Sequence, residues 1–315
     1  MARARNGQKP EITKRRTETA ARSTTKKPTA RVPAKKPAAR RKKPPMAERY
    51  DLHELYEQSV QAPAEDCKLF RKLFKKLRGR EPLVLREDFC GTAQLSAAWC
   101  LGDKRRSAIA VDLDGPTLAW GREHNLEPNR RRLGSRMRLL QRDVLEPSVG
   151  RADITAANNF SFCIFKTRDL LRSYLERARQ GLKRDGVLFL EIFGGKDSIY
   201  PLVEERELDR WTYVWEQESF DPITHHTMCR IHFNFPDGSK IHNAFSYDWR
   251  LWSLPELNDL LLEVGFRDVR VFWEKIEEED TDGDGICDGT GEYEDVTGKP
   301  VEQIESFLVY MAGLR

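Results

Sequence analysis

The sequence predicts an α/β fold with a mostly parallel central sheet, helices on both faces and added C-terminal antiparallel strands. Three observations predict it. Five apolar runs alternate with helix-like segments between residues 83 and 195, as in a parallel sheet. Several runs end in an acid or an Asn, where the carboxyl ends of parallel strands form a ligand site. After residue 205, short alternating runs follow one another with turns between them, which is typical of antiparallel strands.

The parallel part is expected to contain five strands and three connecting helices. The strands are, in order, LVLREDF, SAIAVDLDG, MRLLQRDVLEP, ADITAANNFSF and VLFLEIFGG. The helices are expected over residues 94–101, 116–125 and 167–183. Ligands of such sheets bind at the carboxyl ends of the strands, where Glu87, Asp112, Asp143 and Asn159 are expected.

The first strand and the turn after it predict a nucleotide pocket. A strand carries Glu87 and Asp88 to its end, small residues at 90–92 bring the backbone close to a ligand, and a helix begins. Asp112 ends the next strand about 20 residues later, where an acid can accept hydrogen bonds from ribose hydroxyls. A strand–glycine–helix corner without a ligand is the structural alternative, since any α/β domain can contain one.

These residues resemble the class I S-adenosylmethionine-dependent methyltransferase family, over about residues 50–195. The matching motifs are Glu87 to Ala93, Val111 to Asp114, Arg142 to Val144 and Ala157 to Ser161. The similarity is closest to a bacterial group with an EDFCGT first motif. It implies a Rossmann-like fold and S-adenosyl-L-methionine as the cofactor. The residues expected to bind the cofactor are Tyr56, Gln61, Arg86, Glu87, Asp88, Phe89, Cys90, Gly91, Thr92, Asp112, Leu113, Asp143, Val144, Asn159 and Phe160.

The first motif departs from the family pattern at two positions. Phe89 replaces the family's first glycine and Ala93 its last. Phenylalanine does not readily take a positive φ angle, so we expect a loop of different shape. A dinucleotide site needs G-x-G-x-x-G, of which only one glycine is present, so NAD is the weaker choice of cofactor.

Two amphipathic helices, over residues 52–60 and 64–78, precede the first strand. In related methyltransferases such an N-terminal segment folds over the cofactor, and the resemblance implies a lid containing Tyr56, Val60 and Gln61. Ordinary helix packing is the alternative for each of these residues.

The C-terminal part is expected to hold the methyl acceptor. Strands over 211–220, 226–235 and 240–249, a helix capped by Ser253 and closing strands over 266–274 and 305–314 are predicted. They are expected to bring together Trp215, Glu216, Tyr247, Asp248, Arg250 and Trp252. Aromatic walls would exclude water and attract the positive sulfonium of the cofactor. Glu216, Tyr247 and Arg250 are the candidate catalytic residues, and Glu216 could orient or deprotonate an amine or hydroxyl. The alternative is that these aromatic residues fill the core.

Composition divides the chain into a basic tail over residues 1–46 and a domain over 47–315. The tail carries 16 Lys and Arg against two acids, so it is expected to be disordered and the domain is net negative. The tail could contact nucleic acid non-specifically through its charge, or it could be a solubilising extension. Within the domain, residues 82–195 are expected to bind the cofactor and 205–315 to form the substrate side. No apolar run is long enough for a membrane span.

Cysteine and acid patterns favour no metal. The six cysteines include no CxxC pair, which favours reduced thiols in a cytoplasmic protein. Asp280, Asp282 and Asp284 begin like a calcium loop, continued by Gly285 and Asp288. However, position twelve is Gly291, so a solvated acidic loop is the preferred interpretation.

The sequence therefore predicts a methyltransferase that uses S-adenosylmethionine to methylate an unidentified N or O nucleophile of a small molecule or peptide. Two rivals stay open. One is an RNA or DNA methyltransferase that the basic tail delivers to its substrate. The other is a nucleic-acid-binding protein of the same fold that has lost activity, against which the acids Glu87, Asp112 and Asp143 argue.

Overall fold

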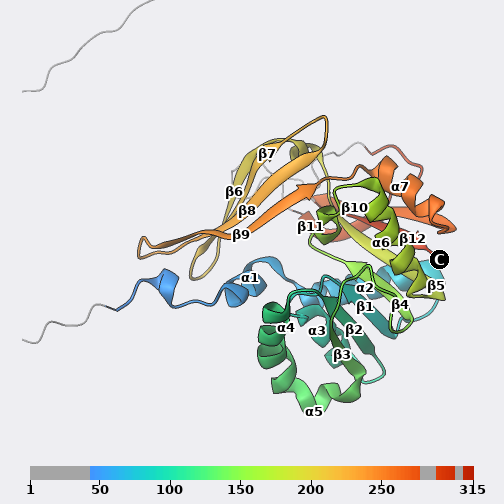
Figure 1. Cartoon of the computed structure of the whole chain (residues 1–315), viewed down its shortest axis with the longest axis horizontal. Coiled ribbons are helices and arrows are strands. Elements are labelled where there is room, and N and C mark those ends of the chain that lie inside the picture. Colours follow the sequence, from blue (N-terminus) through green and yellow to red (C-terminus); the bar gives the residue numbers. More distant parts are fainter. Residues whose placement is uncertain (1–42, 277–288, 302–307) are drawn as a thin grey trace, which may run out of the picture. The chain divides into compact units, whose positions relative to one another are not determined.

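An eight-stranded sheet forms the centre of the structure (Figure 1), with the strand order β11-β10-β12-β5-β4-β1-β2-β3. Its strands are β1 (Val84–Asp88), β2 (Ser107–Asp112), β3 (Met137–Gln141), β4 (Ala152–Ala157), β5 (Leu182–Phe193), β10 (Asp268–Ile276), β11 (Gly289–Asp295) and β12 (Leu308–Leu314). The first five are parallel, whereas β12, β10 and β11 each run antiparallel to the neighbour before them. The predicted mostly parallel sheet with antiparallel additions is confirmed.

The computed structural model describes residues 43–276, 289–301 and 308–315. Residues 44–315 form one unit of the chain and residues 1–43 another. Nearly all of the basic tail and the calcium-like residues Asp280 to Asp288 lie outside the described residues, so the predictions on them stay predictions. Among the helices in the described ranges, none is long and apolar enough to cross a membrane.

Helices cover both faces of the sheet. They are α1 (Leu52–Val60), α2 (Pro63–Arg78), α3 (Gln94–Gly102), α4 (Gly115–Gly121), α5 (Arg130–Leu133), α6 (Arg168–Gln180) and α7 (Leu254–Glu263). Phe70 and Trp99 of α2 and α3 share a core with Phe189 of β5. Leu171 of α6 shares the other large core with Leu190 of the same strand. Side chains of a strand alternate between its faces, so β5 contributes to both cores.

Local sequence signals account for the helix boundaries. Asp51 caps α1 by accepting hydrogen bonds from the backbone of His53 and Glu54. Ser253 and Glu256 form a capping box at the start of α7, which confirms the predicted cap. The helix predicted over 116–125 is α4 followed by one π-helical turn over Arg122–Leu126.

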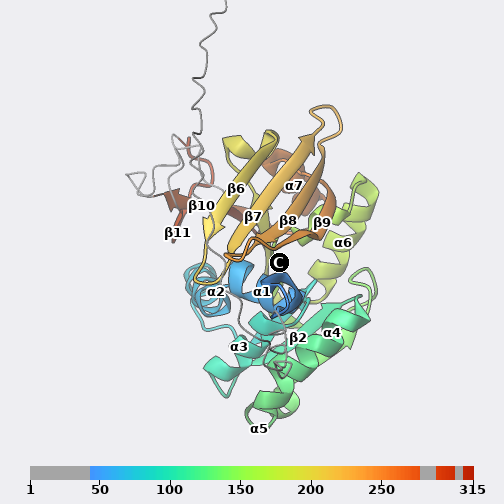
Figure 2. The ribbon, with the colours of Figure 1, turned by 90° about the vertical axis from the view of Figure 1, so that its left-hand side faces the viewer.

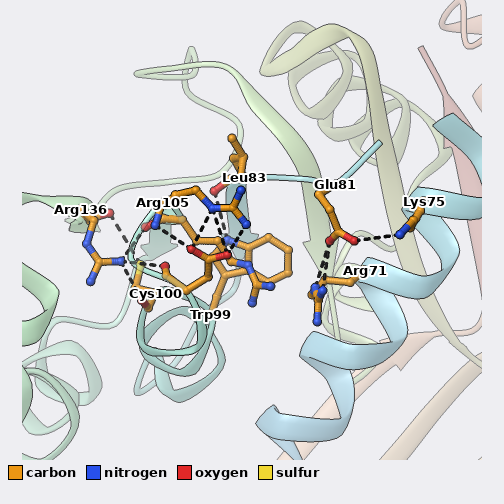
Figure 3. A network of polar contacts seen from close by, with 10 residues as sticks. Arg71, Lys75, Glu81, Leu83, Trp99, Cys100, Arg105 and Arg136 are labelled. Carbon is orange, nitrogen blue, oxygen red and sulfur yellow. Dashed lines mark hydrogen bonds and ion pairs between the residues drawn. The ribbon is translucent and has the colours of Figure 1, made fainter. Parts of the chain in front are cut away.

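A polar network at the amino end of β1 fixes α2 and α3 to the sheet (Figure 3). Glu81 pairs with Arg71 and Lys75 of α2, at 3.2 and 3.4 Å. The Trp99 indole of α3 donates to the Leu83 carbonyl at 3.3 Å. These contacts lie at the end of β1 away from Glu87 and Asp88, so they support the fold and leave the carboxyl end for a ligand.

A second, four-stranded antiparallel sheet follows β5, in the order β6-β7-β8-β9. Its strands are β6 (Leu202–Glu207), β7 (Thr212–Phe220), β8 (His226–Asn234) and β9 (Lys240–Arg250). The three predicted strands β7, β8 and β9 are confirmed, as is the turn at 236–238, where Gly238 has a φ of 82°. Two strands, β6 and β11, are not predicted by the sequence pattern, and β11 lies within residues 277–295, the segment expected to be an acidic loop.

Candidate active site

A cavity of about 220 Å³, here called the small cavity, lies at the carboxyl ends of β1, β2 and β4. The strand order turns between β1 and β4, and this is where open α/β sheets bind ligands. The small cavity is lined by His53, Tyr56, Gln61, Glu87, Asp88, Phe89, Cys90, Gly91, Thr92, Asp112, Asp114, Thr117, Asn158, Asn159, Ser161, Phe245 and Tyr247. Most residues expected to bind the cofactor are therefore brought together.

The turn after β1 takes a strained left-handed conformation. Phe89 has a φ of 59° and Ala93 a φ of 58°. The expectation that phenylalanine would avoid this region is wrong at Phe89. Each such residue costs about 1–2 kcal/mol, and packing of the Phe89 ring at 5.5 Å from that of Tyr174 helps to offset it. Packing in the surrounding core therefore stabilises the strained backbone of Phe89 at the edge of the small cavity.

The acids of the first two strands are held by backbone and side-chain donors. The Asp112 carboxylate accepts from the backbone N–H of Gly91 at 2.7 Å and of Asp114 at 2.9 Å. Glu87 accepts from the backbone and hydroxyl of Ser96 at the start of α3. Burial raises the pKa of Glu87 to about 7 despite these bonds. The turn is thus fastened to the tip of β2 by the carboxylate expected to bind ribose.

Helix α1 lies between the second sheet and the part of the chain that holds β2 and α4 (Figure 2), and its residues His53 and Tyr56 line the small cavity. The ring of Tyr56 lies 5.0 Å from that of Phe245, and its hydroxyl hydrogen-bonds with Tyr247 on β9. One residue further along, the buried carboxylate of Glu57 accepts from Thr92, Gln94 and Asn125. The helix is therefore tied on one side to the second sheet and on the other to the turn after β1. Of the three residues expected in the lid, Tyr56 and Gln61 line the small cavity and Val60 lines the large one, and a role as a lid stays a prediction.

The aromatic residues of the second sheet form a layer beside the small cavity. The Tyr247 and Trp249 rings stack at 4.5 Å, and Trp215 lies 6.2 Å from Tyr247. Trp215 and Trp249 are buried, so they belong to the core, whereas Tyr247 reaches the cavity. The core interpretation therefore describes Trp215 and Trp249, whereas a role of Tyr247 in an acceptor pocket stays a prediction.

Two of the candidate catalytic residues do not line the small cavity. Glu216 alternates with Trp215 on β7 and therefore points to the opposite face, where it meets His232 at 3.0 Å. Arg250 pairs with Glu256 at 3.0 Å and lies over the Trp252 ring at 3.8 Å. The expectation that Glu216, Tyr247 and Arg250 converge on an acceptor is therefore wrong, because neighbouring side chains of a strand point to opposite faces of the sheet.

Five of the expected cofactor residues lie outside the cavity lining. Arg86 is buried and pairs with Asp88 at 2.6 Å. Asp143 accepts from the backbone of Leu145 at 2.9 Å and so closes its own turn. Leu113 is 67% exposed, whereas Val144 and Phe160 are buried in the core. Asp143 nevertheless follows β3, the neighbour of β2, next to the tip that carries Asp112.

Sequence reasoning missed some residues that the structure brings to the site. Asn158 and Ser161 flank Asn159 and Phe160, which are predicted to bind the cofactor, so their position in the sequence could have indicated that they lie at the site. His53 and Glu57 are four residues apart on α1 and share a helix face, which helical spacing could have revealed. The sequence carries no such signal for Phe245, because its place depends on the packing of β9 against α1.

A second cavity of about 710 Å³, here called the large cavity, adjoins the small one. Gln61, Glu87, Asn158 and Asn159 line both. The large cavity is also lined by four side chains from α2, β5, β10 and β12, which are Asp66, Glu191, Glu274 and Tyr310. Burial and nearby carboxyl groups raise the pKa of Asp66 to about 8, and burial raises that of Glu274 to about 7. In the described part of the chain, no group of three metal-binding side chains is found.

The Asp66→Asn variant is expected to be more stable than the wild type above pH 8. Because the pKa of Asp66 is raised from 3.8 to about 8, the folded state holds its proton more tightly than the unfolded chain does. The wild type therefore loses stability as the pH rises through this window, and the variant does not lose that part. We expect a gain above about 1 kcal/mol, since a tenfold change in proton binding is worth about 1.4 kcal/mol.

The measurement is urea unfolding of both proteins across that pH range. Acids that do not interact with Asp66 titrate alike in both, so the difference reports Asp66 together with its coupling to Glu191 and Glu87. The difference should vanish near pH 3.5, below the ordinary pKa of aspartate. A constant difference at all pH values would contradict the assignment.

Solved structures of other proteins are similar to this chain in fold, although their sequences are not. No family model and no curated protein matches the sequence. Among solved structures, an S-adenosylmethionine-dependent methyltransferase from Clostridium acetobutylicum is 17% identical, with a TM-score of 0.56 over 83% of this chain and 97% of that one. CalS10, an amino pentose methyltransferase from Micromonospora echinaspora, was solved with S-adenosylmethionine bound. It is 14% identical, with a TM-score of 0.57 over 84% and 97%.

A third neighbour is the sugar N-methyltransferase KedS8 from a Streptoalloteichus species. It is 14% identical, with a TM-score of 0.54 over 84% of this chain and 93% of that one. Each of the three structures is covered over more than nine-tenths of its length, so the likeness in fold extends over most of both chains. The chain has the fold of S-adenosylmethionine-dependent methyltransferases.

Proposed function

We propose that this protein is an S-adenosylmethionine-dependent methyltransferase that acts on a small molecule or peptide. The observation that carries the proposal is Asp112, whose carboxylate ends β2 in the small cavity and holds the backbone of Gly91. Carboxylates in this position bind ribose hydroxyls, and the turn beside it brings backbone close to a ligand. Likeness in fold to small-molecule methyltransferases supports the same function.

The residues present fit the cofactor. Gln61 and Asn158 line the small cavity, and the amide oxygen of each, Gln61 Oε1 and Asn158 Oδ1, is buried without a hydrogen-bond partner in the described residues. Buried acceptors of this kind are normally satisfied, so they support a ligand with donor groups. At about 220 Å³ the small cavity is below the roughly 300–1,000 Å³ of typical ligand sites. The cofactor would therefore need more room than the small cavity offers in this structure.

The protein's part in the reaction is mainly to position and enclose the reactants. When bound, S-adenosylmethionine supplies an electrophilic methyl group on a positive sulfur. Tyr56, Phe245 and Tyr247 would place aromatic rings beside that charge. Burial raises the pKa of Tyr56 to about 12, so its hydroxyl is a hydrogen-bond donor rather than a base at neutral pH. Holding a nucleophile in line with the methyl group can supply much of the rate without a dedicated base.

The test is calorimetric binding of S-adenosylmethionine and S-adenosylhomocysteine. Asp112→Ala is expected to weaken both at least about tenfold, because hydrogen bonds to a charged group contribute about 1.5–3 kcal/mol. The exposed Asp169→Ala on α6 is the matched control and should bind like the wild type. If the wild type binds neither compound, the proposed function is wrong. Equal affinity of Asp112→Ala and the wild type would remove Asp112 from the site.

A further inference from the structure

We infer that the large cavity binds the methyl acceptor, and that the acceptor presents an amine to the small cavity. This inference rests on the proposed function and decides between the N and O nucleophiles that the sequence leaves open. The two cavities meet at Gln61, Glu87, Asn158 and Asn159, which line both. A molecule in the large cavity therefore reaches the edge of the small cavity, where a methyl group would be delivered.

The junction between the cavities offers hydrogen-bond acceptors that lack donors. Gln61 Oε1 and Asn158 Oδ1 are shielded from solvent and find no donor in the described residues. The backbone N–H of Asn159 donates to the Glu191 carboxylate, which also lines the large cavity. Glu87 carries a carboxylate at the same junction. A group that brings several N–H donors would satisfy these oxygens, and an ammonium group brings three.

The charge of the large cavity favours the same ligand. Asp66 interacts with the like charges of Glu191 and Glu87, and its carboxylate has no hydrogen bond or ion pair in the described residues. Glu191 is oriented by the Tyr310 hydroxyl, which donates to it at 2.7 Å. Two lysines also line the cavity, but both are exposed, and Lys68 pairs with Glu65 at 2.8 Å. Among the residues that the structure describes, no cation pairs with Asp66 or Glu191, and an amine ligand would supply one.

The carboxylates also suit the proton that an amine must lose. An ammonium group has to give up one proton before its nitrogen can attack. Burial and the neighbouring carboxyl groups raise the pKa of Asp66 to about 8, so its carboxylate form predominates above that pH and accepts the proton there. The N–C bond then forms as the C–S bond breaks, and the electron pair of that bond stays on sulfur. The products are a methylated amine, S-adenosylhomocysteine and a protonated Asp66, which returns its proton to solvent.

S-adenosylmethionine carries an ammonium group of its own, so the cofactor could supply the same chemistry at the junction. Two probes separate these sources. S-adenosylhomocysteine has the ammonium group, whereas 5′-methylthioadenosine keeps the nucleoside and sulfur without the amino acid part. If Asp66→Asn weakens binding of the first probe but not of the second, the cofactor's ammonium is the ligand of Asp66. That result would overturn the assignment to the acceptor.

The acceptor is tested with cyclohexylamine and cyclohexanol, which differ only in the amine and hydroxyl. Each is titrated calorimetrically into the full chain with and without S-adenosylhomocysteine. A pH of about 8.5 keeps Asp66, with its pKa of about 8, mostly ionised and the amine protonated. We expect the amine to bind about tenfold more tightly than the alcohol, because charge-assisted hydrogen bonds are roughly twice as strong as neutral ones.

The preference should fall to near unity in Asp66→Asn and persist in Asp169→Asn, the same change at an exposed aspartate of α6 that lines neither cavity. Thermal melting of each variant checks that it is folded. Equal binding of amine and alcohol, no binding of the amine at millimolar concentration, or an unchanged preference in Asp66→Asn would overturn the inference. The titrations without S-adenosylhomocysteine test the acceptor site even if the wild type binds no cofactor. Absence of cofactor binding would contradict only the proposed function.

Discussion

Replacing Arg86 with Met is expected to lower the free energy of unfolding by about 3–5 kcal/mol, the usual effect of breaking a buried ion pair from one side. Arg86 is 2% exposed and its Nε lies 2.6 Å from the Asp88 carboxylate, which also accepts from the Tyr174 hydroxyl at 3.2 Å. Burial raises the pKa of Asp88, and Arg86 opposes that effect. Without the guanidinium, Asp88 must take up a proton or stay charged in the core.

Urea unfolding at neutral pH measures the loss, with Arg105→Met as the control. Arg105 makes a comparable 2.7 Å pair with Asp103 on the surface, and its removal should leave the unfolding midpoint unchanged. The double variant Arg86→Met, Asp88→Leu removes both charges and should recover much of the stability. A stable Arg86→Met protein with weakened S-adenosylhomocysteine binding would instead restore Arg86 as a cofactor residue.

The residues at strand ends could be predicted from the sequence, because the signal is local. Glu87, Asp112 and Asn159 each follow an apolar run, and parallel strands bring such residues to one edge. The direction of a side chain on an antiparallel strand is different. Glu216 and Trp215 are adjacent, and only the packing of β7 decides which of them faces inward. Chemical type alone therefore favours Glu216 as a catalytic residue, although its side chain lies on the face of β7 away from the small cavity.

The two strands that the sequence pattern does not predict share a physical reason. Both β6 and β11 lie at the edge of a sheet, and their sequences, LVEERE and GTGEYED, are rich in acids. An edge strand has one neighbour and tolerates charge, so its hydrophobic alternation is weak. Phe89 is a related case, because its positive φ is imposed by the surrounding core and not by its own preference.

Replacing Glu57 with Gln is expected to loosen α1 and to weaken cofactor binding about tenfold or more. Three side-chain donors converge on this buried carboxylate, from Thr92, Gln94 at 3.1 Å and Asn125 at 2.7 Å. An amide replaces one oxygen with a donor and removes the charge, so at least one of the three donors is left unpaired. Hydrogen bonds to a charged group contribute about 1.5–3 kcal/mol each, which sets the size of the effect.

Calorimetry with S-adenosylhomocysteine and hydrogen exchange over residues 52–60 measure the two effects. Glu54→Gln changes the same helix, where Glu54 accepts only from Gln58 among the described side chains, and it should behave like the wild type. Unchanged exchange in Glu57→Gln would contradict a role in holding the helix.

The same variant tests whether α1 couples the turn after β1 to the second sheet. Ser59, on the opposite side of α1 from that turn, accepts from the Trp211 indole at 3.0 Å, and Tyr56 contacts Phe245. If Glu57 holds one side of a rigid helix, a ligand at the turn should slow exchange in β7 and β9 of the wild type. In Glu57→Gln the ligand should still slow hydrogen exchange in the turn after β1. It should no longer slow exchange in β7 and β9, because the helix no longer links the turn to these strands. Protection that spreads to the strands in both proteins would mean that another path connects the two sheets.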